Sequence, residues 1–460
     1  RLLKMSQGTM LVDTYRSEGI RRVKLVFTDI DGVMRGKYIS LDKFSGVAEG
    51  VSGFCDCVLG WDVNDQLYDN AEFTGWHTAF PDALYRIDLN TERRLKEEGD
   101  IPLFLAEFVS EDDRPHPICP RSRLQSVIAK ANALGFQSHM AFEYEFFVFK
   151  ETAQSAADKG YRNLMPLTPG NFGYSALRTF TLSDLFNELM DYCEDHDLPL
   201  ESVHCETGPG VWEAAIAVDD CLKAADKAAL FKTLVKAFFQ KRGMIATFMA
   251  KWSMDYPGQS GHLHQSLVTK DSGAGAFYDA ADPLMMSAVM KQYVAGVQRY
   301  LPELLAVVAP TINSYSRLVK GAWAPTASTW GVENRTCALR VIRGSTKSQR
   351  MEFRVGSADA NPYLTAAATL GAGLLGIESA LVLDEPVSGN AYDAQDALPA
   401  SQQFSSNLLD ATRKFATSSA AEKIFGAAFR AHFTASRDWE VREYERHVND
   451  WQLARYFEII

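Results

Sequence analysis

A strand-like segment that carries two carboxylates constrains this chain more than any other feature. Residues 140–149 run Met-Ala-Phe-Glu-Tyr-Glu-Phe-Phe-Val-Phe. Because side chains alternate along a strand, Glu143 and Glu145 share one face while Tyr144 and Phe146 take the other. Two like charges side by side in a core are costly. The segment therefore predicts a cation between the two carboxylates, and a divalent metal is the simplest choice.

The composition is that of a globular protein with a large core. The chain has 460 residues, of which 47% are hydrophobic and 23% charged. By length alone we expect about two to three domains. The net charge of −11 argues against a general nucleic-acid surface and against an anionic membrane partner.

Cysteine usage and hydropathy favour a cytoplasmic location. The seven cysteines form no metal-ligand spacing and are interpreted as reduced thiols. No run of residues is long enough to span a bilayer. We interpret residues 1–4, which precede Met5, as a trimmed remnant and not as a secretory signal.

The pattern of short segments predicts an α+β protein with an N-terminal extension over residues 1–20, a small β-rich domain over 21–115 and a larger domain over 116–460. Three prolines within residues 111–120 end regular structure and mark the boundary. In the larger domain, periodicity predicts helices over residues 121–134, 182–195, 219–251, 283–308 and 362–383. It predicts strands over 136–149, 200–206, 211–217, 261–268 and 336–356, followed by a helical tail from about residue 401.

Other predicted strands repeat the pattern of charge on a buried segment. Glu206 and Glu213 flank a Gly-Pro-Gly turn, His262 and His264 share a strand face, and Glu352 lies between two arginines. Taken singly, each could be a salt bridge or a core histidine. Together they provide five glutamates and a histidine, enough for two oxygen-rich sites that suit magnesium or manganese better than zinc.

Positive charge is concentrated in one stretch of this acidic chain. Six arginines fall within 38 residues, with Lys320 and Lys347 between them: Arg317, Arg335, Arg340, Arg343, Arg350 and Arg354. Guanidinium groups suit phosphates and carboxylates, and arginines beside metals indicate phosphoryl transfer. Neither a Gly-x4-Gly-Lys-Ser/Thr loop nor a Gly-rich dinucleotide turn is present. The residues themselves thus predict a two-metal, arginine-lined phosphoryl-transfer enzyme.

At this point the chain resembles the glutamine synthetase family, from about Val23 to the tail. Seven blocks carry the resemblance in order: DGVMRGK at 31–37, EYEFF at 143–147, ETGPG at 206–210, GHLHQSL at 261–267, APTINSYSRLV at 309–319, ENRT at 333–336 and ANPYL at 360–364. The resemblance implies a small N-terminal β-grasp domain and a catalytic domain with a curved antiparallel sheet and helices. It also implies a homo-oligomeric ring, a hexamer or dodecamer, with active sites between subunits.

The same resemblance implies roles for individual residues. One magnesium or manganese ion would be held by Glu145, Glu206 and Glu213, and a second by Glu143, His262 and Glu352. Positions that contact ATP would be Glu201, His264, Ser266, Lys347 and Arg350, with Arg340 close to the nucleotide phosphates. Gly258, Arg317, Arg335 and Arg354 match positions around glutamate and the transferred phosphate, the last two in catalytic roles. The implied reaction uses ATP to convert glutamate into γ-glutamyl phosphate, which an amine then attacks.

The chain departs from ammonia-using members of the family at two places. Trp323 stands where a glutamate is expected before Ala-Pro, and residues 54–62 replace the family's ammonium loop. Asp62, or less favourably Asp56, could supply the missing anion beside Trp61. Trp323, Trp61 and Trp330 then suggest an aromatic-walled pocket for an amine larger than ammonia, with aromatic or alkyl monoamines favoured.

Several alternatives stay open from the sequence. A tryptophan face could hold a polyamine. Ordinary glutamine synthesis from ammonia and simple loop packing by Trp323 are further candidates. An inactive structural member of the family would show eroded metal ligands, whereas all six are present.

Overall fold

The structure is a computed structural model that describes residues 5–460, so the predicted remnant at residues 1–4 lies outside it. The N-terminal part is a six-stranded sheet in the order β2-β1-β6-β4-β3, with β5 paired to β6. Strands β1 and β6 are parallel and the other pairs antiparallel. The elements are α1 Gln7–Ser17, β1 Arg22–Thr28, β2 Met34–Ser40, α2 Leu41–Val47, β3 Ser52–Cys55, β4 Asp82–Ile87, β5 Arg93–Leu95 and β6 Ile101–Phe108.

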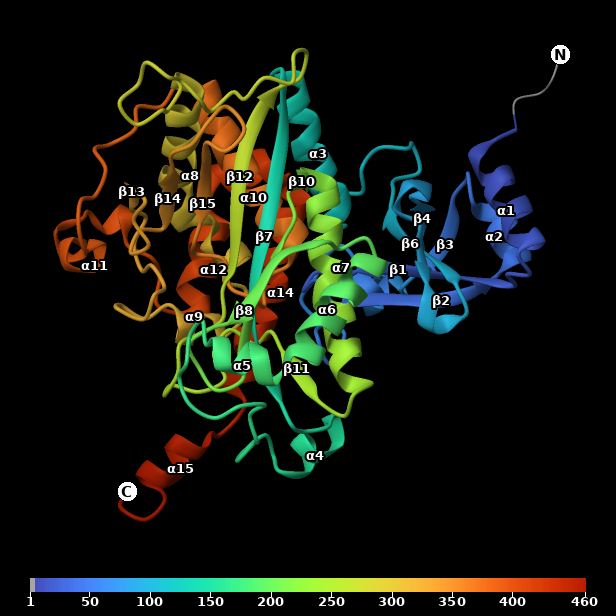
Figure 1. Cartoon of the computed structure of the whole chain (residues 1–460), viewed down its shortest axis with the longest axis horizontal. Helices are drawn as coiled ribbons and strands as arrows, with labels where there is room; N and C mark the ends of the chain where they lie inside the picture. Colours follow the sequence, from blue (N-terminus) through green and yellow to red (C-terminus); the bar gives the residue numbers. More distant parts are fainter. Residues whose placement is uncertain (1–4) are drawn as a thin grey trace.

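A nine-stranded sheet forms the centre of the larger part, in the order β13-β14-β15-β12-β7-β9-β8, with β10 and β11 also paired to β7. Strands β7 and β12 run side by side through its middle (Figure 1). The strands are β7 Phe136–Phe149, β8 Leu200–Cys205, β9 Val211–Ile216, β10 Asp219–Asp220, β11 Ile245–Thr247, β12 Gly261–Thr269, β13 Trp330–Val332, β14 Leu339–Ile342 and β15 Arg350–Phe353.

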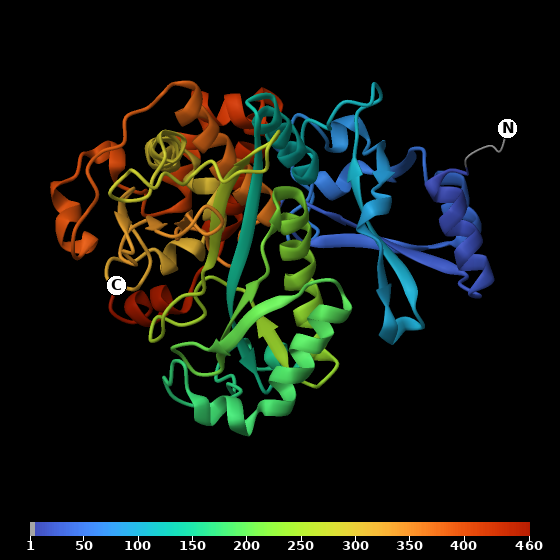
Figure 2. The ribbon, with the colours of Figure 1, turned by 45° about the horizontal axis from the view of Figure 1, so that its top comes forward.

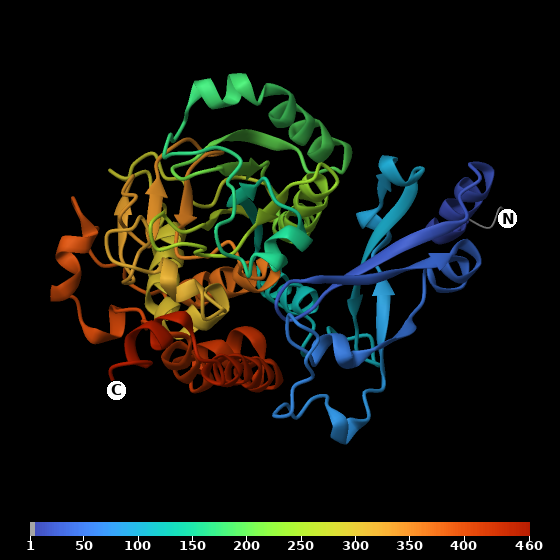
Figure 3. The same cartoon turned by 90° about the horizontal axis from the view of Figure 1, so that it is seen from below.

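Helices cover this sheet. Figure 3 shows α5 and α6, in green, on the opposite side of the larger part from the C-terminal helices in red. The helices are α3 Pro120–Ala133, α4 Ala153–Asp158, α5 Ala176–Thr181, α6 Ser183–Asp195, α7 Cys221–Gln240, α8 Ala288–Val308, α9 Ser314–Arg317, α10 Pro362–Glu378, α11 Ala391–Ala394, α12 Leu408–Ala416, α13 Ser419–Phe425, α14 Ala427–Glu445 and α15 Asp450–Tyr456.

Two of the predicted segments differ from the structure. The helix expected over residues 219–251 ends at Gln240, and strand β11 follows a turn that Gly243 makes at φ +71°. The strand expected over 336–356 is two antiparallel strands, β14 and β15, joined by a turn. In both segments the pattern of apolar residues continues on either side of the turn, so it does not reveal where the chain reverses.

Buried polar contacts join the two sheets' domains, which lie side by side in Figure 2. Arg121 at the start of α3 donates to Asp226 on α7 and to Glu107 on β6. Arg437 on α14 donates to Asp31, in the loop after β1, at 2.6 Å. No helix in residues 5–460 combines the length and apolar character needed to cross a membrane.

Candidate active site

One face of β7 presents the side chains that the sequence singled out. The even-numbered residues from Ser138 to Val148 are buried, whereas His139, Ala141, Glu143 and Glu145 are only partly buried. The strand register places Glu143 opposite His262 on β12 and Glu145 opposite Glu213 on β9. Cross-strand neighbours on one face have Cβ atoms about 5 Å apart, so strands distant in sequence bring these groups together.

The first cluster lies on β8, β9 and the turn between them. His204, Glu206 and Glu213 offer ligand atoms within 4.8 Å of one another. His204 Nε2 lies 3.2 Å from Glu206 Oε2 and 4.0 Å from Glu213 Oε2. Burial and the neighbouring carboxylates of Glu145, Glu143 and Glu206 raise the pKa of Glu213 to about 10. Several carboxylates gathered at one point repel one another, and a divalent cation would offset that repulsion.

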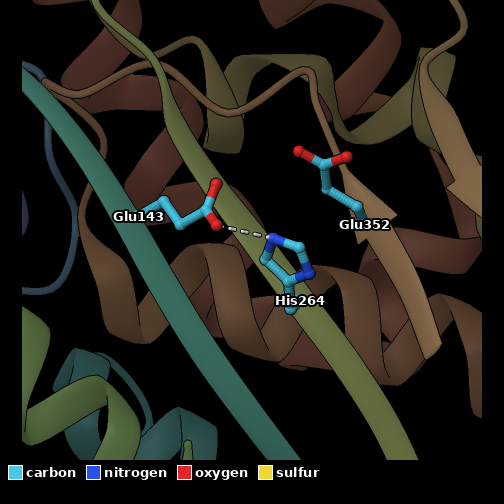
Figure 4. A group of neighbouring side chains, drawn as sticks. All are labelled: Glu143, His264 and Glu352. Atoms are coloured by element: carbon cyan, nitrogen blue, oxygen red, sulfur yellow. Dashed lines mark ion pairs between the residues drawn. The ribbon is translucent and has the colours of Figure 1, made fainter. Parts of the chain in front are cut away.

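The second cluster spans β7, β12 and β15 (Figure 4). His264 Nε2 lies 3.0 Å from Glu143 Oε1, and His262 Nδ1 lies 3.3 Å from Glu352 Oε1. Although burial opposes it, the charges of His262, Arg354 and His264 lower the pKa of Glu352 to about 2. The ligand atoms of Glu143, Glu352 and His264 all lie within 4.8 Å of one another, so His264 competes here with the predicted ligand His262.

Both clusters fit divalent cations by their donor chemistry. Carboxylate oxygens with one imidazole each suit magnesium or manganese. His262 Nε2 is buried and has no hydrogen-bond partner among residues 5–460, and Glu145 Oε2 accepts from the Ser260 backbone N–H at 2.9 Å. Buried polar atoms left without partners are costly, and a bound ion would satisfy them.

Arginines surround Glu352, and they differ in accessibility. Arg340 Nη1 and Arg354 Nη1 donate to its two carboxylate oxygens at 2.9 and 2.8 Å. Arg335 is exposed. Arg317 is 2% exposed and donates to the backbone oxygens of Val355 and Arg354. Arg317 therefore holds the chain just after β15 in place.

Gly258 packs directly against Arg317. A Cβ atom on Gly258 would lie 2.6 Å from Arg317 Cγ and 2.7 Å from the Ala250 carbonyl oxygen. The glycine therefore permits the close passage of the chain that buries Arg317.

A cavity of about 260 Å³ adjoins the second cluster. It brings together five of the six predicted nucleotide-binding residues, namely Glu201, His264, Ser266, Lys347 and Arg350. Arg350 Nε donates to His264 Nδ1 at 3.0 Å. The sixth, Arg340, lies outside the lining and pairs with Glu333 as well as Glu352. Cations beside a metal-binding cluster are what a polyphosphate requires.

The three tryptophans of the predicted aromatic pocket differ in exposure and in their contacts. Trp323 is 63% exposed at φ +58°, in the turn before Ala324. Trp330 is buried and donates from Nε1 to the Asp384 carbonyl, so it packs the core and cannot line a pocket. Trp61 is half-buried in the first domain, with the Arg35 guanidinium over its ring at 4.6 Å.

Asp62 is a poor candidate for the anion of an amine pocket. It is 5% exposed, and Oδ1 accepts from the backbone N–H groups of Asn64 and Gln66 while Oδ2 accepts from Trp439 Nε1. Asp56 is also buried and accepts from the Thr74 hydroxyl. Both carboxylates hold loops in place. The sequence did not reveal this because Thr74 lies 18 residues from Asp56, and Trp439 lies 377 residues from Asp62.

Two site residues were not predicted from the sequence. His204 joins the first cluster because its strand register sets it opposite Glu213. Tyr174 stacks on His204, with ring centroids 4.4 Å apart, and is 74% exposed. The alternation His204-Cys205-Glu206 could have indicated the first, whereas nothing local marks Tyr174, which sits in an irregular loop.

Two acidic clusters with imidazoles, arginines at their edge and a cavity beside them define a metal-dependent phosphoryl-transfer enzyme. Residues 117–456 match the family described as glutamine synthetase, catalytic domain. The chain belongs to this family, as its motifs implied, and has its α+β fold. Members of the family use ATP and divalent metals, which fits both clusters.

Similar proteins include several ligases. The chain is 44% identical over 444 residues to Type-1 glutamine synthetase 2 of Dictyostelium discoideum, covering 95% of this chain and 84% of that protein. It is 36% identical over 450 residues to the glutamate–isopropylamine ligase of a Pseudomonas species, covering 97% of each. A solved GmaS complex with ADP superposes with a TM-score of 0.83 at 27% identity, covering 97% of this chain and 99% of that one. The chain is accordingly an ATP-dependent glutamate–amine ligase.

Proposed function

We propose that the amine acceptor of this ligase is larger than ammonia, with aromatic or alkyl monoamines as its substrates. The observation that carries the proposal is Trp323, a 63% exposed indole in place of the acid that serves ammonium. An exposed indole offers apolar surface and no negative charge. Tyr174, exposed beside the first cluster, adds a second aromatic surface.

The reaction proceeds through an acyl phosphate. The glutamate γ-carboxylate attacks the γ-phosphorus of ATP, and ADP leaves with the electron pair of the broken P–O bond. The amine nitrogen then attacks the γ-carbonyl carbon of γ-glutamyl phosphate, loses a proton and expels inorganic phosphate. The product is a γ-glutamylamide.

The residues of the two clusters have different roles in this reaction. We assign one ion to Glu145, Glu206 and Glu213 and a second to Glu143, Glu352 and a histidine, either His262 or His264. Bound ions would neutralise charge on the transferred phosphoryl group. Arg335 and Arg354 stabilise the same charge, and the cavity that contains Lys347 and Arg350 holds ATP.

Ammonia is the second candidate acceptor, because the relative at 44% identity is named a glutamine synthetase. A polyamine is a further alternative, since an indole face binds cations. Trp323 favours the monoamines over ammonia and polyamines, because a large, neutral side chain suits an apolar acceptor.

The test is phosphate release with ATP and glutamate against ammonia, isopropylamine, an aromatic amine and putrescine. A monoamine is expected to have the highest kcat/KM. Trp323→Glu should shift the preference towards ammonia, while Trp76→Glu, at a 75% exposed tryptophan of the first domain, should leave the order of acceptors unchanged. Ammonia as the best acceptor of the unaltered enzyme would overturn the proposal.

We also propose that the chain assembles into a ring, and that its location is cytoplasmic. The C-terminal residues expose several large apolar side chains, which a free monomer rarely does: Val448, Trp451, Leu453, Phe457 and Ile460. Native mass spectrometry should give a hexamer or dodecamer. Removal of residues 448–460 should reduce the fraction of the protein that is in this oligomer. A monomer at micromolar concentration would contradict the ring.

A further inference from the structure

His139 lies on the same face of β7 as the metal-binding carboxylates, and the function described so far does not use it. It is partly buried and sits opposite Ser266 on β12 and Asp220 on β10. Its imidazole makes no hydrogen bond to any other group in residues 5–460. A half-buried imidazole on an open sheet face is available to a ligand.

The cavity beside the second cluster extends from Glu143 to His139. Ala141 on β7, between these two residues, and Ala215 on β9, opposite Glu143, line the cavity, and their small side chains leave the space that larger residues would fill. Residues 139 and 143 are four positions apart on one strand, which separates them by roughly 13 Å. That span matches the reach of a nucleoside triphosphate from its γ-phosphate to its sugar.

The two ends of the cavity differ in chemistry. Glu143, which pairs with His262, marks the end at the metal-binding cluster, where phosphates would meet the bound ions. The Arg350 guanidinium reaches His264, which pairs with Ala141 between the two ends, and it also suits phosphates. The far end holds His139 and Ser266, which pair across β7 and β12, and the lining also includes the apolar side chains of Ile216 and Val218. An apolar wall suits the face of a base, and polar side chains suit the hydroxyl groups of a sugar.

We propose that His139 hydrogen-bonds a ribose hydroxyl of ATP and so sets the enzyme's preference for ribonucleotides. A neutral imidazole has one donor and one acceptor nitrogen, and a hydroxyl can meet either. The inference rests on the proposed function, because it places ATP in this cavity. Its role is binding and positioning, since His139 lies at the end away from the transferred phosphate.

The variant His139→Leu keeps a side chain of similar bulk and removes the hydrogen bond. We expect it to raise the Kd and KM for ATP about tenfold, the worth of one good hydrogen bond, with kcat unchanged at saturation. The Kd for 2′-deoxy-ATP or 3′-deoxy-ATP, whichever lacks the contacted hydroxyl, should be the same in the unaltered protein and the variant. His139→Asn should restore part of the discrimination, and His447→Leu, at an exposed histidine after α14, should change none of these constants.

Calorimetric binding of ATP and both deoxynucleotides, with thermal melting to verify the fold, gives the result independently of turnover. Equal weakening of all three nucleotides in His139→Leu, or no weakening, would overturn the inference. Loss of ribonucleotide discrimination in a protein that forms no γ-glutamylamide would sustain the inference and refute the proposed function instead.

Discussion

Trp323 holds a backbone conformation that a bulky side chain seldom adopts. Its φ is +58°, in the left-handed region, and its ring is 63% exposed, so little packing within the chain repays the strain. Strain of this kind persists where function requires the side chain. Trp323 thus carries backbone strain while its ring faces solvent.

Trp323→Asn is expected to raise the free energy of unfolding by about 0.5–1 kcal/mol, because asparagine tolerates positive φ. The same variant should lose selectivity for large amines. Urea denaturation and the acceptor panel measure the two effects. A fall in stability would mean instead that the indole packs the loop.

Glu352 is the most enclosed carboxylate of the second cluster. It is 2% exposed and lies between Arg340 and Arg354. Glu352→Gln keeps its shape and removes its charge, so metal-dependent ATP cleavage should fall at least about 100-fold. Manganese titration and phosphate release check this.

Glu333→Gln provides the control for Glu352→Gln, since it removes the other carboxylate bound to Arg340 without touching either cluster. We expect its manganese affinity to be unchanged. Normal ATP cleavage by Glu352→Gln would refute the assignment of this residue as a metal ligand.

At the scale of elements, two glycines set the distance between helices α8 and α10. A Cβ atom on Gly296 would lie 2.2 Å from the Ala372 carbonyl oxygen, and one on Gly376 would lie 2.1 Å from that of Gln292. The two backbones thus touch at the glycines. A side chain there must push the helices apart.

Gly296→Ala should lower the free energy of unfolding by about 1–3 kcal/mol, because overpacking displaces rigid backbone. Gly46→Ala, in α2 with nothing within 4 Å of its Cβ position, should raise it by about 0.5–1 kcal/mol. Thermal melting of both variants compares one substitution in two surroundings. Similar melting temperatures would show that α8 and α10 separate easily.

At the scale of the whole molecule, two buried histidines lie where the first domain meets α14. His432 Nε2 lies 2.6 Å from the Leu59 carbonyl oxygen, and His116 Nδ1 accepts from the backbone N–H groups of Ile118 and Cys119. Burial lowers the pKa of both to about 4, helped by Arg123 at His116 and Arg437 at His432. Both imidazoles are therefore neutral in the folded protein near neutral pH.

Acid should loosen this contact between the domains. The unfolded chain binds protons at these histidines near pH 6.5, and the folded chain near pH 4, so stability is lost as pH falls through that window. At pH 5 the loss is about 2 kcal/mol for each histidine. His432→Gln should reduce the loss between pH 7 and pH 5 by that amount in urea titrations.

His77→Gln, in an exposed loop of the first domain, is the matched control and should leave the pH dependence as it was. A His432→Gln protein that loses as much stability as the unaltered one would place the acid sensitivity elsewhere.

Local pattern was enough to predict much of this protein. Alternation along β7 follows from strand geometry, so the shared face of Glu143 and Glu145 could be foreseen, and ordered motifs identified the family. The register of β7 against β12 and β9, and of β12 against β15, joins residues up to 209 positions apart, because Glu143 and Glu352 meet in one cluster. No local signal encodes such pairings.

Long-range packing also decided which polar residues are free to act. Asp62, Trp330 and Arg317 carry groups typical of an active site, yet each is buried and bonded within the chain. His204 and Tyr174 joined the site because a strand and a loop met. Chemistry resides in side chains and can be inferred from their order, whereas burial depends on contacts between distant segments and arises only on folding.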